Sequence, residues 1–460
     1  MAAVQAPLTD EEFTSAVELL RRIIPADDFP AYALEVSPAT VYTTLVTLWM
    51  LTLQRLGGGE SLSTTIKEVL THSRELLPNN KRVREGTLSE GSGAYSQARK
   101  RLPLETVRAF AERVSQSLIE RSPPWFEGRR AFIIDGTTMT LSPTSELRDA
   151  YPPATNQHGE TVWPVMLLMV AHELQSGCAL LPEFGAMYGP DNTSEARQAA
   201  AIGRRIPPGS LILADAGFGI FSVAHAMVGA GQEILFRLTK SRYKALRRQA
   251  AALHKTARSE RHRLSWVPSP KDRRTNPDLP AEACLEIFLH DVELDNGERL
   301  HLATTLDVSS EQATEFYGRR YDVEHDIRDM KVSLGIENIR AKSDAMVQKE
   351  LLCSVVAYNL VVELRRAAAK VANVAPRRLS FTGVWTTMQT YLLRQPPCSA
   401  AEWHARYERA LRSAANAKLP NRSGRSYPRQ AHPCRAKSTK FMKQQAKPNL
   451  KIAPPPEKPK

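Results

Sequence analysis

The sequence has few cysteines and no long apolar run. Its 460 residues include five cysteines, an odd number, and no two of them form a C-x-x-C pair. A scattered, odd set argues against a disulfide framework or a zinc site and fits a reducing compartment. The longest apolar run, Val41 to Leu53, covers about 13 residues and carries four threonines, which is too short to cross a bilayer core of about 30 Å. We therefore expect no membrane partner.

Several short motifs of well-defined chemistry are also missing. The chain has no G-x-x-x-x-G-K-[ST] phosphate loop and no strand-linked G-x-G-x-x-G, so nucleotide hydrolysis and dinucleotide binding are unsupported. Its histidines show neither H-x-x-x-H nor HNH spacing. The amino terminus lacks a basic region followed by an apolar stretch and a small-residue cleavage site, so export is not indicated.

Acidic residues are in deficit, and the excess positive charge is concentrated in two segments. The chain has 62 Lys+Arg and 49 Asp+Glu, a net charge of +13. Residues 237–274 carry 13 Lys/Arg and two acids, residues 411–460 carry 13 Lys/Arg and one acid, and the other 372 residues have a net charge of −10. Two such blocks favour contact with a polyanion such as nucleic acid, although solvated tails and loops have the same composition.

The hydrophobic pattern divides the chain into five regions. A composition of 42% hydrophobic and 24% charged residues is that of a globular protein with room for more than one domain. Helical patterns fill the first region, which opens with a capping box at Thr9 and Glu12. The regions are a helical N-terminal region (1–125), the first part of a core (126–220), a β-rich insertion (221–312), the second part of the core (313–395) and a basic, largely disordered tail (396–460) that contains at most a short helix at 400–414.

Two buried strands are predicted to end in an aspartate. Ala131–Ile134 is a short apolar run that leads into Asp135, and Leu211–Ala214 is a second run that leads into Asp215. Strands followed by a helix and a further strand indicate a mixed α/β core. In the insertion, Asn-Gly at 296–297 between two apolar runs predicts a β-hairpin.

A helix within residues 310–372 is predicted to carry a polar stripe. Tyr317, Arg320, Glu324 and Lys331 fall inside an arc of about 60° at about 100° per residue, with Arg328 close by. An apolar stripe lies directly beside this arc, which places the carboxylate at the rim of the core. The simpler interpretation is a solvated helix with ion pairs between successive turns.

Three carboxylates placed in this way are what a two-metal site requires. Mg²⁺ takes oxygen ligands, which Asp135, Asp215 and Glu324 would supply. Two ions about 3.5–4 Å apart stabilise the attacking and leaving oxygens of an in-line displacement at phosphorus. Arg320 and Lys331 would then contact phosphate along the same helix face.

The spacing on this helix resembles a family signature. Tyr317-(2)-Arg320-(3)-Glu324-(6)-Lys331 matches the Y-(2)-R-(3)-E-(6)-K signature of the insertion-sequence type-four family of DDE transposases, to which the Tn-five-like enzymes belong. The resemblance covers residues 40–370. Segments similar to other motifs of that family are Ser96–Pro103, Asp135–Thr138, Leu213–Phe218, Phe236–Lys240, Lys349–Leu352 and Ala357–Leu360.

The resemblance implies a fold and an activity. The fold is α/β, with a ribonuclease H-like core interrupted by the β-rich insertion, and the triad of Asp135, Asp215 and Glu324 binds two Mg²⁺ ions, with Mn²⁺ as a substitute. The activity is cut-and-paste DNA transposition by a homodimer on double-stranded DNA, in a bacterial cytoplasm at the nucleoid, with the N-terminal helices recognising the element ends. One departure is Ala216, where many relatives have a basic residue. The expected DNA contacts are Tyr317, Arg320, Arg328, Lys331, Lys240, Arg242 and Trp266.

Three assignments have alternatives. Trp266 is a candidate either for stacking on a flipped base or for the core of the insertion. Glu195 belongs to Asn192-Thr-Ser-Glu195, which predicts a capping box and therefore a structural role. A catalytically inactive DNA-binding protein of transposase descent, or a structure-specific nuclease with the same metal site, would replace transposition; the presence of all three carboxylates argues against the first.

Overall fold

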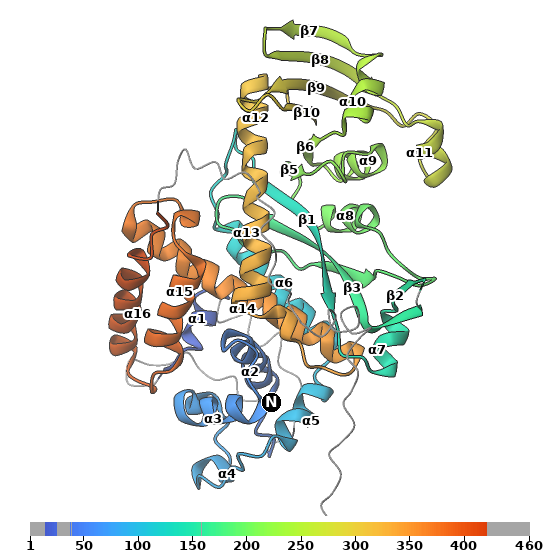
Figure 1. Ribbon diagram of the computed structural model, residues 1–460. Coiled ribbons are helices and arrows are strands. Elements are labelled where there is room, and N and C mark those ends of the chain that lie inside the picture. Colours follow the sequence, from blue (N-terminus) through green and yellow to red (C-terminus); the bar gives the residue numbers. More distant parts are fainter. Residues whose placement is uncertain (1–13, 25–36, 38, 158, 421–460) are drawn as a thin grey trace, which may run out of the picture. The chain divides into compact units, whose positions relative to one another are not determined.

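A ten-stranded mixed sheet organises the part of the chain that the computed structural model describes, residues 14–24, 37, 39–157 and 159–420 (Figure 1). The strand order is β2-β3-β1-β5-β6-β10-β9-β8-β7, and β4 pairs with β3 beside this path. The protein therefore has the mixed α/β class that the sequence predicts. The strands are β1 Ala131–Thr140, β2 Pro153–Asn156, β3 Gly159–Glu173, β4 Glu183–Ala186, β5 Leu211–Ala214, β6 Glu233–Arg237, β7 Ala251–Lys255, β8 Ser259–Trp266, β9 Leu285–Glu293 and β10 Arg299–Thr304.

The centre of the sheet is parallel, and its register aligns the two predicted aspartates. Strands β1 and β5 run parallel with Ile133 opposite Leu213, and β5 runs parallel to β6. Continuous apolar sequence suits strands that are covered on both faces, and every residue of 131–134 and 211–214 is buried. Continuing the register by two residues brings Asp135 level with Asp215 at the carboxyl edge of the sheet.

Side-chain alternation along these strands feeds two separate cores. Ile133 and Leu213 belong to a cluster that includes Val323, from the helix with the polar stripe. Ile134 and Ile212 project to the opposite face and join the larger cluster, which includes the helices before and after β5. The central sheet is therefore packed between two layers.

The N-terminal region is helical, as predicted. The helix α2 begins after Thr43, whose hydroxyl accepts a hydrogen bond from the Val46 amide, and it ends at Leu56 with Gly57 as its C-cap. The predicted capping box at Thr9 and Glu12 lies outside the described residues. The helices are α1 Glu18–Arg21, α2 Thr44–Leu56, α3 Leu62–His72, α4 Lys81–Arg84, α5 Gly93–Arg101 and α6 Leu104–Glu120.

The insertion continues the same sheet rather than forming a separate compact unit. Its predicted hairpin is present, with β9 and β10 joined through Gly297 at φ +80°. Strand β10 also pairs antiparallel with β6, which links the hairpin to the central strands. The first basic stretch contains α10 (Lys240–Arg247), α11 (Pro270–Thr275) and the pair β7–β8, which its hydrophobic pattern did not predict.

The helix with the polar stripe is a succession of helical segments. It starts with α12 (Ser310–Gly318), continues through a 3₁₀ turn at Arg319–Tyr321 into α13 (Asp322–Arg328), and ends in a π-helical turn at Asp329–Ser333 (Figure 1). A capping box at Ser309 and Gln312 starts it, which provides partners for free backbone amides.

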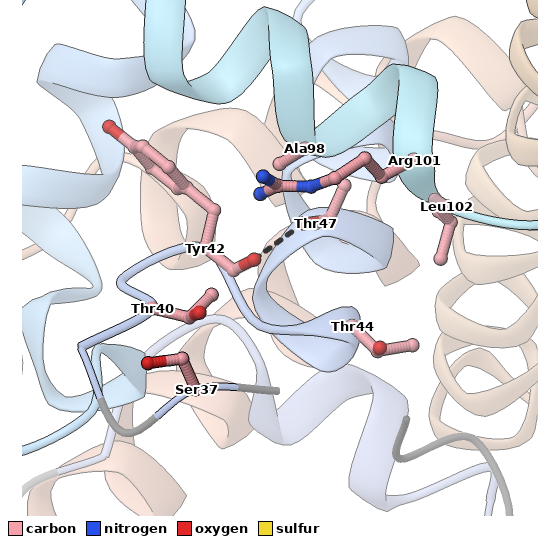
Figure 2. A pocket seen from close by; sticks show the side chains of 8 residues that line it. All are labelled: Ser37, Thr40, Tyr42, Thr44, Thr47, Ala98, Arg101 and Leu102. Atoms are coloured by element: carbon pink, nitrogen blue, oxygen red, sulfur yellow. Dashed lines mark hydrogen bonds between the residues drawn. The ribbon is translucent and has the colours of Figure 1, made fainter. Parts of the chain in front are cut away.

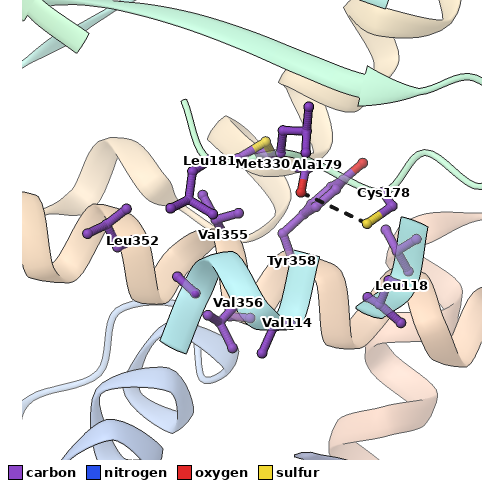
Figure 3. Close-up of a cluster of buried hydrophobic side chains, with 14 of the residues drawn as sticks. Val114, Leu118, Cys178, Ala179, Leu181, Met330, Leu352, Val355, Val356 and Tyr358 are labelled. Atoms are coloured by element: carbon purple, nitrogen blue, oxygen red, sulfur yellow. Dashed lines mark hydrogen bonds between the residues drawn. The ribbon is translucent and has the colours of Figure 1, made fainter. Parts of the chain in front are cut away.

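A long apolar helix, α14 (Asp344–Ala372), fills the middle of the larger core. It has the length and apolarity of a membrane span, but 83% of that window is buried inside the protein. Figure 3 shows Val355, Val356 and Tyr358 of α14 among buried side chains that include Val114 of α6 and Met330 of the π-helical turn. The apolar character of α14 is thus accounted for by packing.

The compact unit extends further toward the carboxyl end than the sequence suggests. The sequence places the start of the tail at 396, but α16 (Ala400–Ala415) follows α15 (Phe381–Met388) and packs on α14, with Trp403 and Tyr407 among its buried residues. The short helix predicted at 400–414 is therefore part of the core. The compact unit ends at Lys418, and the basic sequence beyond 420 lies outside the described residues.

Candidate active site

Asp135 and Asp215 occupy equivalent positions at the carboxyl edge of the sheet. Each Oδ1 accepts a nearby backbone hydrogen bond of 2.8 Å, from the Gly136 amide for Asp135 and from the Gly217 amide for Asp215. Burial raises the pKa of Asp135 to about 6, and the neighbouring Asp215 raises it further, while the Gly136 amide and Arg320 oppose the shift. Repulsion between nearby carboxylates of this kind is relieved by a cation.

Arg320 connects the first and third predicted carboxylates. Its guanidinium lies 3.8 Å from Asp135 Oδ2 and donates a 2.8 Å hydrogen bond to Glu324 Oε1. The helix segment α13 packs against β1, which brings Glu324 to this edge, but the Glu324 side chain is 53% exposed. The structure therefore brings the predicted triad to one region and places a guanidinium between two of its members.

The remaining residues of the helix signature differ in their surroundings. Lys331 Nζ donates to the Thr138 carbonyl at 2.9 Å and pairs with Glu337 at 2.7 Å, so it is anchored beside the end of β1. Tyr317 is buried, and that burial raises its pKa to about 12 although Arg320 opposes the shift. Arg328 is exposed.

The predicted DNA contacts at the start of α10 lie next to Asp215. Arg242 Nη1 donates a 2.6 Å hydrogen bond to the carbonyl of Ala216, the residue that follows Asp215. Lys240 is exposed at the first position of the same helix. A guanidinium from the insertion thus supports the turn that carries the second aspartate.

Trp266 is placed in the core, which corrects its assignment as a stacking residue. It ends β8, is only 5% exposed, and meets Phe221 edge-to-face with ring centroids 5.6 Å apart. The burial alternates along β8, and Trp266 falls on the buried face. Of the two assignments that the sequence left open, the structure supports the core.

Glu195 is not the capping residue that the sequence predicts. Ser194 is the N-cap of α8 (Glu195–Gly203), since its hydroxyl accepts from the Arg197 amide, and no capping box involves Glu195. The Glu195 carboxylate instead lies directly against Gly136. Partial burial, and then Asp215, raise its pKa. Sequence reasoning missed this residue, although a helix that leads into a parallel strand starts at the carboxyl edge of the sheet, where first-turn side chains can reach such a site.

A buried network of ion pairs and hydrogen bonds is centred on Asp326 of α13. Asp326 is 1% exposed and accepts hydrogen bonds of 2.7 and 2.8 Å from Arg377, which follows α14. The Tyr358 hydroxyl also donates to Asp326 at 3.3 Å, and His172 of β3 lies 3.7 Å away. Because Asp326 is two residues from Glu324, this network fixes the segment that carries the third carboxylate.

The carboxylate donors suit a divalent cation, although they are not gathered into one cluster. Within the described ranges, no group of three His, Cys, Asp or Glu side chains is close enough together to hold a metal ion. Asp135 and Asp215 nevertheless offer oxygen donors of the kind that Mg²⁺ prefers. The third predicted carboxylate, Glu324, is paired with Arg320 in this arrangement.

A separate pocket lies among the N-terminal helices. Figure 2 shows it between the start of α2 and the end of α5, with the hydroxyl groups of Thr40 and Thr44 and the side chain of Arg101 around it. It involves none of the elements that carry Asp135 or Asp215.

Comparison with known proteins gives one family match. The family described as the transposase DDE domain matches residues 126–360, more than half of the chain, and this span contains Asp135, Asp215 and Glu324. Among solved structures, the chain is similar to a piggyBac transposase synaptic complex with hairpin DNA, at 10% identity and a TM-score of 0.42, over 93% of this chain and 91% of that one. No curated protein sequence matches.

Proposed function

This chain belongs to the transposase DDE domain family, and we propose that it is a cut-and-paste DNA transposase of the insertion-sequence type-four kind. The proposal is that it cleaves phosphodiester bonds at the ends of its element and joins the freed 3′-hydroxyl groups to target DNA. The observation that carries the proposal is the parallel register of β1 and β5, which aligns Asp135 with Asp215 inside the matched span.

Asp135, Asp215 and Glu324 would hold two divalent cations in this site, Mg²⁺ with Mn²⁺ as a substitute. When bound, such ions activate a water or hydroxyl nucleophile and stabilise the charge that develops on the leaving oxygen. The side chains of the two strand-end aspartates are already oriented by the amides of Gly136 and Gly217. Preorganisation of this kind is what positions a reacting phosphate.

The signature helix is proposed to exchange partners when DNA binds. Arg320 now neutralises Asp135 and Glu324, and a scissile phosphate offers it a bidentate acceptor instead. That exchange frees Glu324 for a cation and leaves Arg320 on the DNA backbone. Lys331, held beside the end of β1, is positioned for a second phosphate contact.

Several features of the wider chain enter the proposal as DNA-binding surfaces. The basic stretch at 237–274 faces the cleaved end through α10, since Arg242 contacts the turn after Asp215. The N-terminal helices recognise the element ends, the basic sequence after 418 adds contacts that do not depend on base sequence, and a homodimer pairs two ends. The five-region division, with the tail beginning after 418, and a nucleoid location in a bacterial cytoplasm belong to the same proposal.

The test uses DNA that carries the inverted repeats flanking the coding sequence. With Mg²⁺, the wild-type protein is expected to nick these ends and to form joined products with a target duplex, which distinguishes a transposase from a nuclease. Asp135→Asn, Asp215→Asn and Glu324→Gln should each lower the rate by more than about a hundredfold, the upper range for a group that only supports a metal ligand.

Matched exposed carboxylates serve as controls. Asp295→Asn, at the tip of the β9–β10 hairpin with a 99% exposed side chain, and Glu105→Gln, 82% exposed at the start of α6, should keep the wild-type rate. Binding of the ends without nicking or joining by the wild type would favour the alternative, an inactive DNA-binding protein of transposase descent. The observation that favours this alternative is that Glu324 is paired with Arg320 and that no group of three carboxylates among the described residues could hold a metal ion.

A further inference from the structure

A buried arginine of the N-terminal helices contacts the turn that follows the signature helix. Arg55 lies in the last turn of α2, and its side chain is only 2% exposed. Its Nη2 donates a 2.7 Å hydrogen bond to the carbonyl of Gly335, which comes two residues after the π-helical turn. The two residues are 280 positions apart in the sequence, so this contact depends on the tertiary structure.

The turn at Gly335 has a conformation that requires glycine. Its φ is +64°, and a β-carbon built there would come within 2.8 Å of Asn338 Nδ2. The Gly335 carbonyl also accepts a 2.8 Å hydrogen bond from the Asn338 amide, which closes the 3₁₀ turn Ile336–Asn338. Arg55 therefore binds the carbonyl on which this turn depends.

The same turn carries the carboxylate that pairs with Lys331. The Lys331 Nζ lies 2.7 Å from Glu337 Oε1, and it donates to the Thr138 carbonyl at 2.9 Å and the Thr137 hydroxyl at 3.2 Å. Two anchors thus fix the ammonium group, strand β1 on one side and the turn on the other. If the turn shifted, Glu337 would move with it and Lys331 would lose one of its anchors.

Two segments that resemble family motifs meet beside Arg55, and neither has a role in the site described above. Glu350 of the segment Lys349–Leu352 pairs with Arg99 of the segment Ser96–Pro103, and Glu350 Oε2 lies 4.0 Å from Arg55 Nη1. All three charged side chains are buried. The ends of α2 and α5 are therefore joined to α14 by one buried ionic network that reaches the turn after the signature helix.

Stability alone is a poor explanation for a guanidinium in this place. Removing a charge from water is costly, and apolar side chains can often replace a buried ion pair without loss of stability. Among the described residues, Arg55 Nε has no hydrogen-bond partner, so the cost of burial is not fully compensated. The contact that an apolar side chain could not replace is the hydrogen bond to the Gly335 carbonyl.

We propose that Arg55 is a positioning residue for DNA cleavage: it holds the Gly335 turn, and the turn holds Lys331 beside the end of β1 for contact with phosphate. The inference rests on the proposed function, in which Lys331 contacts DNA. Because α2 belongs to the helices proposed to recognise the element ends, these helices also support the edge of the sheet where cleavage takes place. Misplacing a group that orients the reacting phosphate lowers the rate of the chemical step.

The experiment measures nicking of the element ends in a single turnover, with protein in excess over DNA, and the affinity for the same ends without divalent cations. Arg55→Met should lower the nicking rate by about tenfold to a hundredfold and keep the affinity within about threefold of the wild type. Lys331→Met should lower the rate at least as much. Adding Arg55→Met to Lys331→Met should cost less than about twofold more, because residues that act through one another are not additive. Arg55→Lys, which keeps a donor, should recover part of the rate.

Two variants test the same turn without removing a buried charge. Gly335→Ala strains the turn directly, and Glu337→Gln removes the partner of Lys331 from a side chain that is 48% exposed. Both should slow nicking and leave the affinity for the ends unchanged. If Arg55→Met does not fold, these two variants decide the question by the same comparison with Lys331→Met.

An arginine that packs elsewhere is the matched control for destabilisation. The Arg22 guanidinium lies 4.0 Å from the ring centroid of Tyr407 in α16. Arg22→Met removes this cation–π contact, so it should lower the melting temperature and keep the nicking rate within about twofold of the wild type. A loss of rate in Arg22→Met equal to that in Arg55→Met would show that destabilisation alone slows nicking, and the positioning role would fail.

Further results would overturn the inference in distinguishable ways. If Arg55→Met and Gly335→Ala both nick the ends at the wild-type rate, or if the losses in Arg55→Met and Lys331→Met multiply, the positioning role fails and the proposed function stands. If the wild type neither nicks nor joins the ends, the proposed function fails and the inference fails with it.

Discussion

Removing Arg377 should destabilise the protein more than the loss of any exposed ion pair. Arg377 donates hydrogen bonds of 2.7 and 2.8 Å to Asp326, whose side chain is 1% exposed. In Arg377→Met that carboxylate stays buried and loses both of these hydrogen bonds, while the Tyr358 hydroxyl at 3.3 Å, His172 at 3.7 Å and the charge of Arg365 remain near it. Breaking a buried pair by removing one partner costs about 3–5 kcal/mol, and we expect a loss of that size in the free energy of unfolding at pH 7.

The pH dependence of this loss has a definite sign. Burial opposes ionisation of Asp326, but Arg377 and His172 outweigh it, so its pKa in the folded protein lies below the ordinary value. A depressed pKa contributes stability above the unfolded value of about 3.9, and that stability is lost as the pH falls through the folded value. In Arg377→Met the strongest of the influences that lower the pKa of Asp326 is lost while its burial remains, so we expect that pKa to rise. The penalty of the variant is therefore largest at pH 7 and narrows toward acid.

Urea unfolding at pH 7.0 and pH 5.5, followed by circular dichroism, measures both effects. Arg412→Met is the control, because Arg412 is 64% exposed and lies 3.8 Å from Glu408, a contact that contributes at most about 1 kcal/mol. Adding Asp326→Asn to Arg377→Met should recover part of the lost stability, since it removes the buried charge. A loss below about 1 kcal/mol at pH 7, or a loss that grows as the pH falls, would refute the reasoning.

Two further predictions concern the basic segments. Trp266→Ala should lower the free energy of unfolding by about 3–5 kcal/mol, which is the range for a buried aromatic side chain. Its affinity for element-end DNA under native conditions should change little. Wild-type stability together with weakened DNA binding would instead support the stacking role. Truncation after residue 418 removes most of the basic tail and should flatten the salt dependence of DNA binding while nicking of bound ends continues. An unchanged slope of affinity against salt would show that the tail does not contact phosphate.

The central strands and the aspartates that follow them could be predicted from the sequence, because a strand that is buried on both faces has a continuous run of apolar residues. The runs before Asp135 and Asp215 have that form, and the Asn-Gly turn specified the β9–β10 hairpin locally. Strand β7 could not be predicted from the sequence. All five of its residues are exposed, so they show no hydrophobic pattern, and its pairing with β8 depends on the tertiary structure. The helix α16 was counted with the tail because the sequence that follows it is basic and poor in large apolar residues.

The members of the candidate site were proposed from the sequence, but their present partners were not accessible to it. Fixed spacing identified Arg320 and Glu324, and the simpler interpretation, an ion pair between successive helical turns, is the contact that forms between them. No local pattern shows that Arg320 also lies 3.8 Å from Asp135, since that depends on α13 packing against β1. Glu195 was assigned to a cap because a first-turn carboxylate has the same local sequence whether it serves the helix or a site in another layer.

The continuous sheet has a mechanical consequence for the insertion. An inserted domain on flexible linkers moves as a separate body, but β10 is joined to β6 and β6 to β5 by backbone ladders. Strands β8 and β9 are paired with each other, and β9 is connected through β10 and β6 to β5, the strand that leads into Asp215. The sheet is continuous between the insertion and β5, so a displacement of β8 or β9 would be passed on to β5. The hydrogen bond from Arg242 to the Ala216 carbonyl is a second connection between the insertion and the turn after Asp215. If a bound duplex displaced β8 or β9, the position of Asp215 would therefore be expected to change as well.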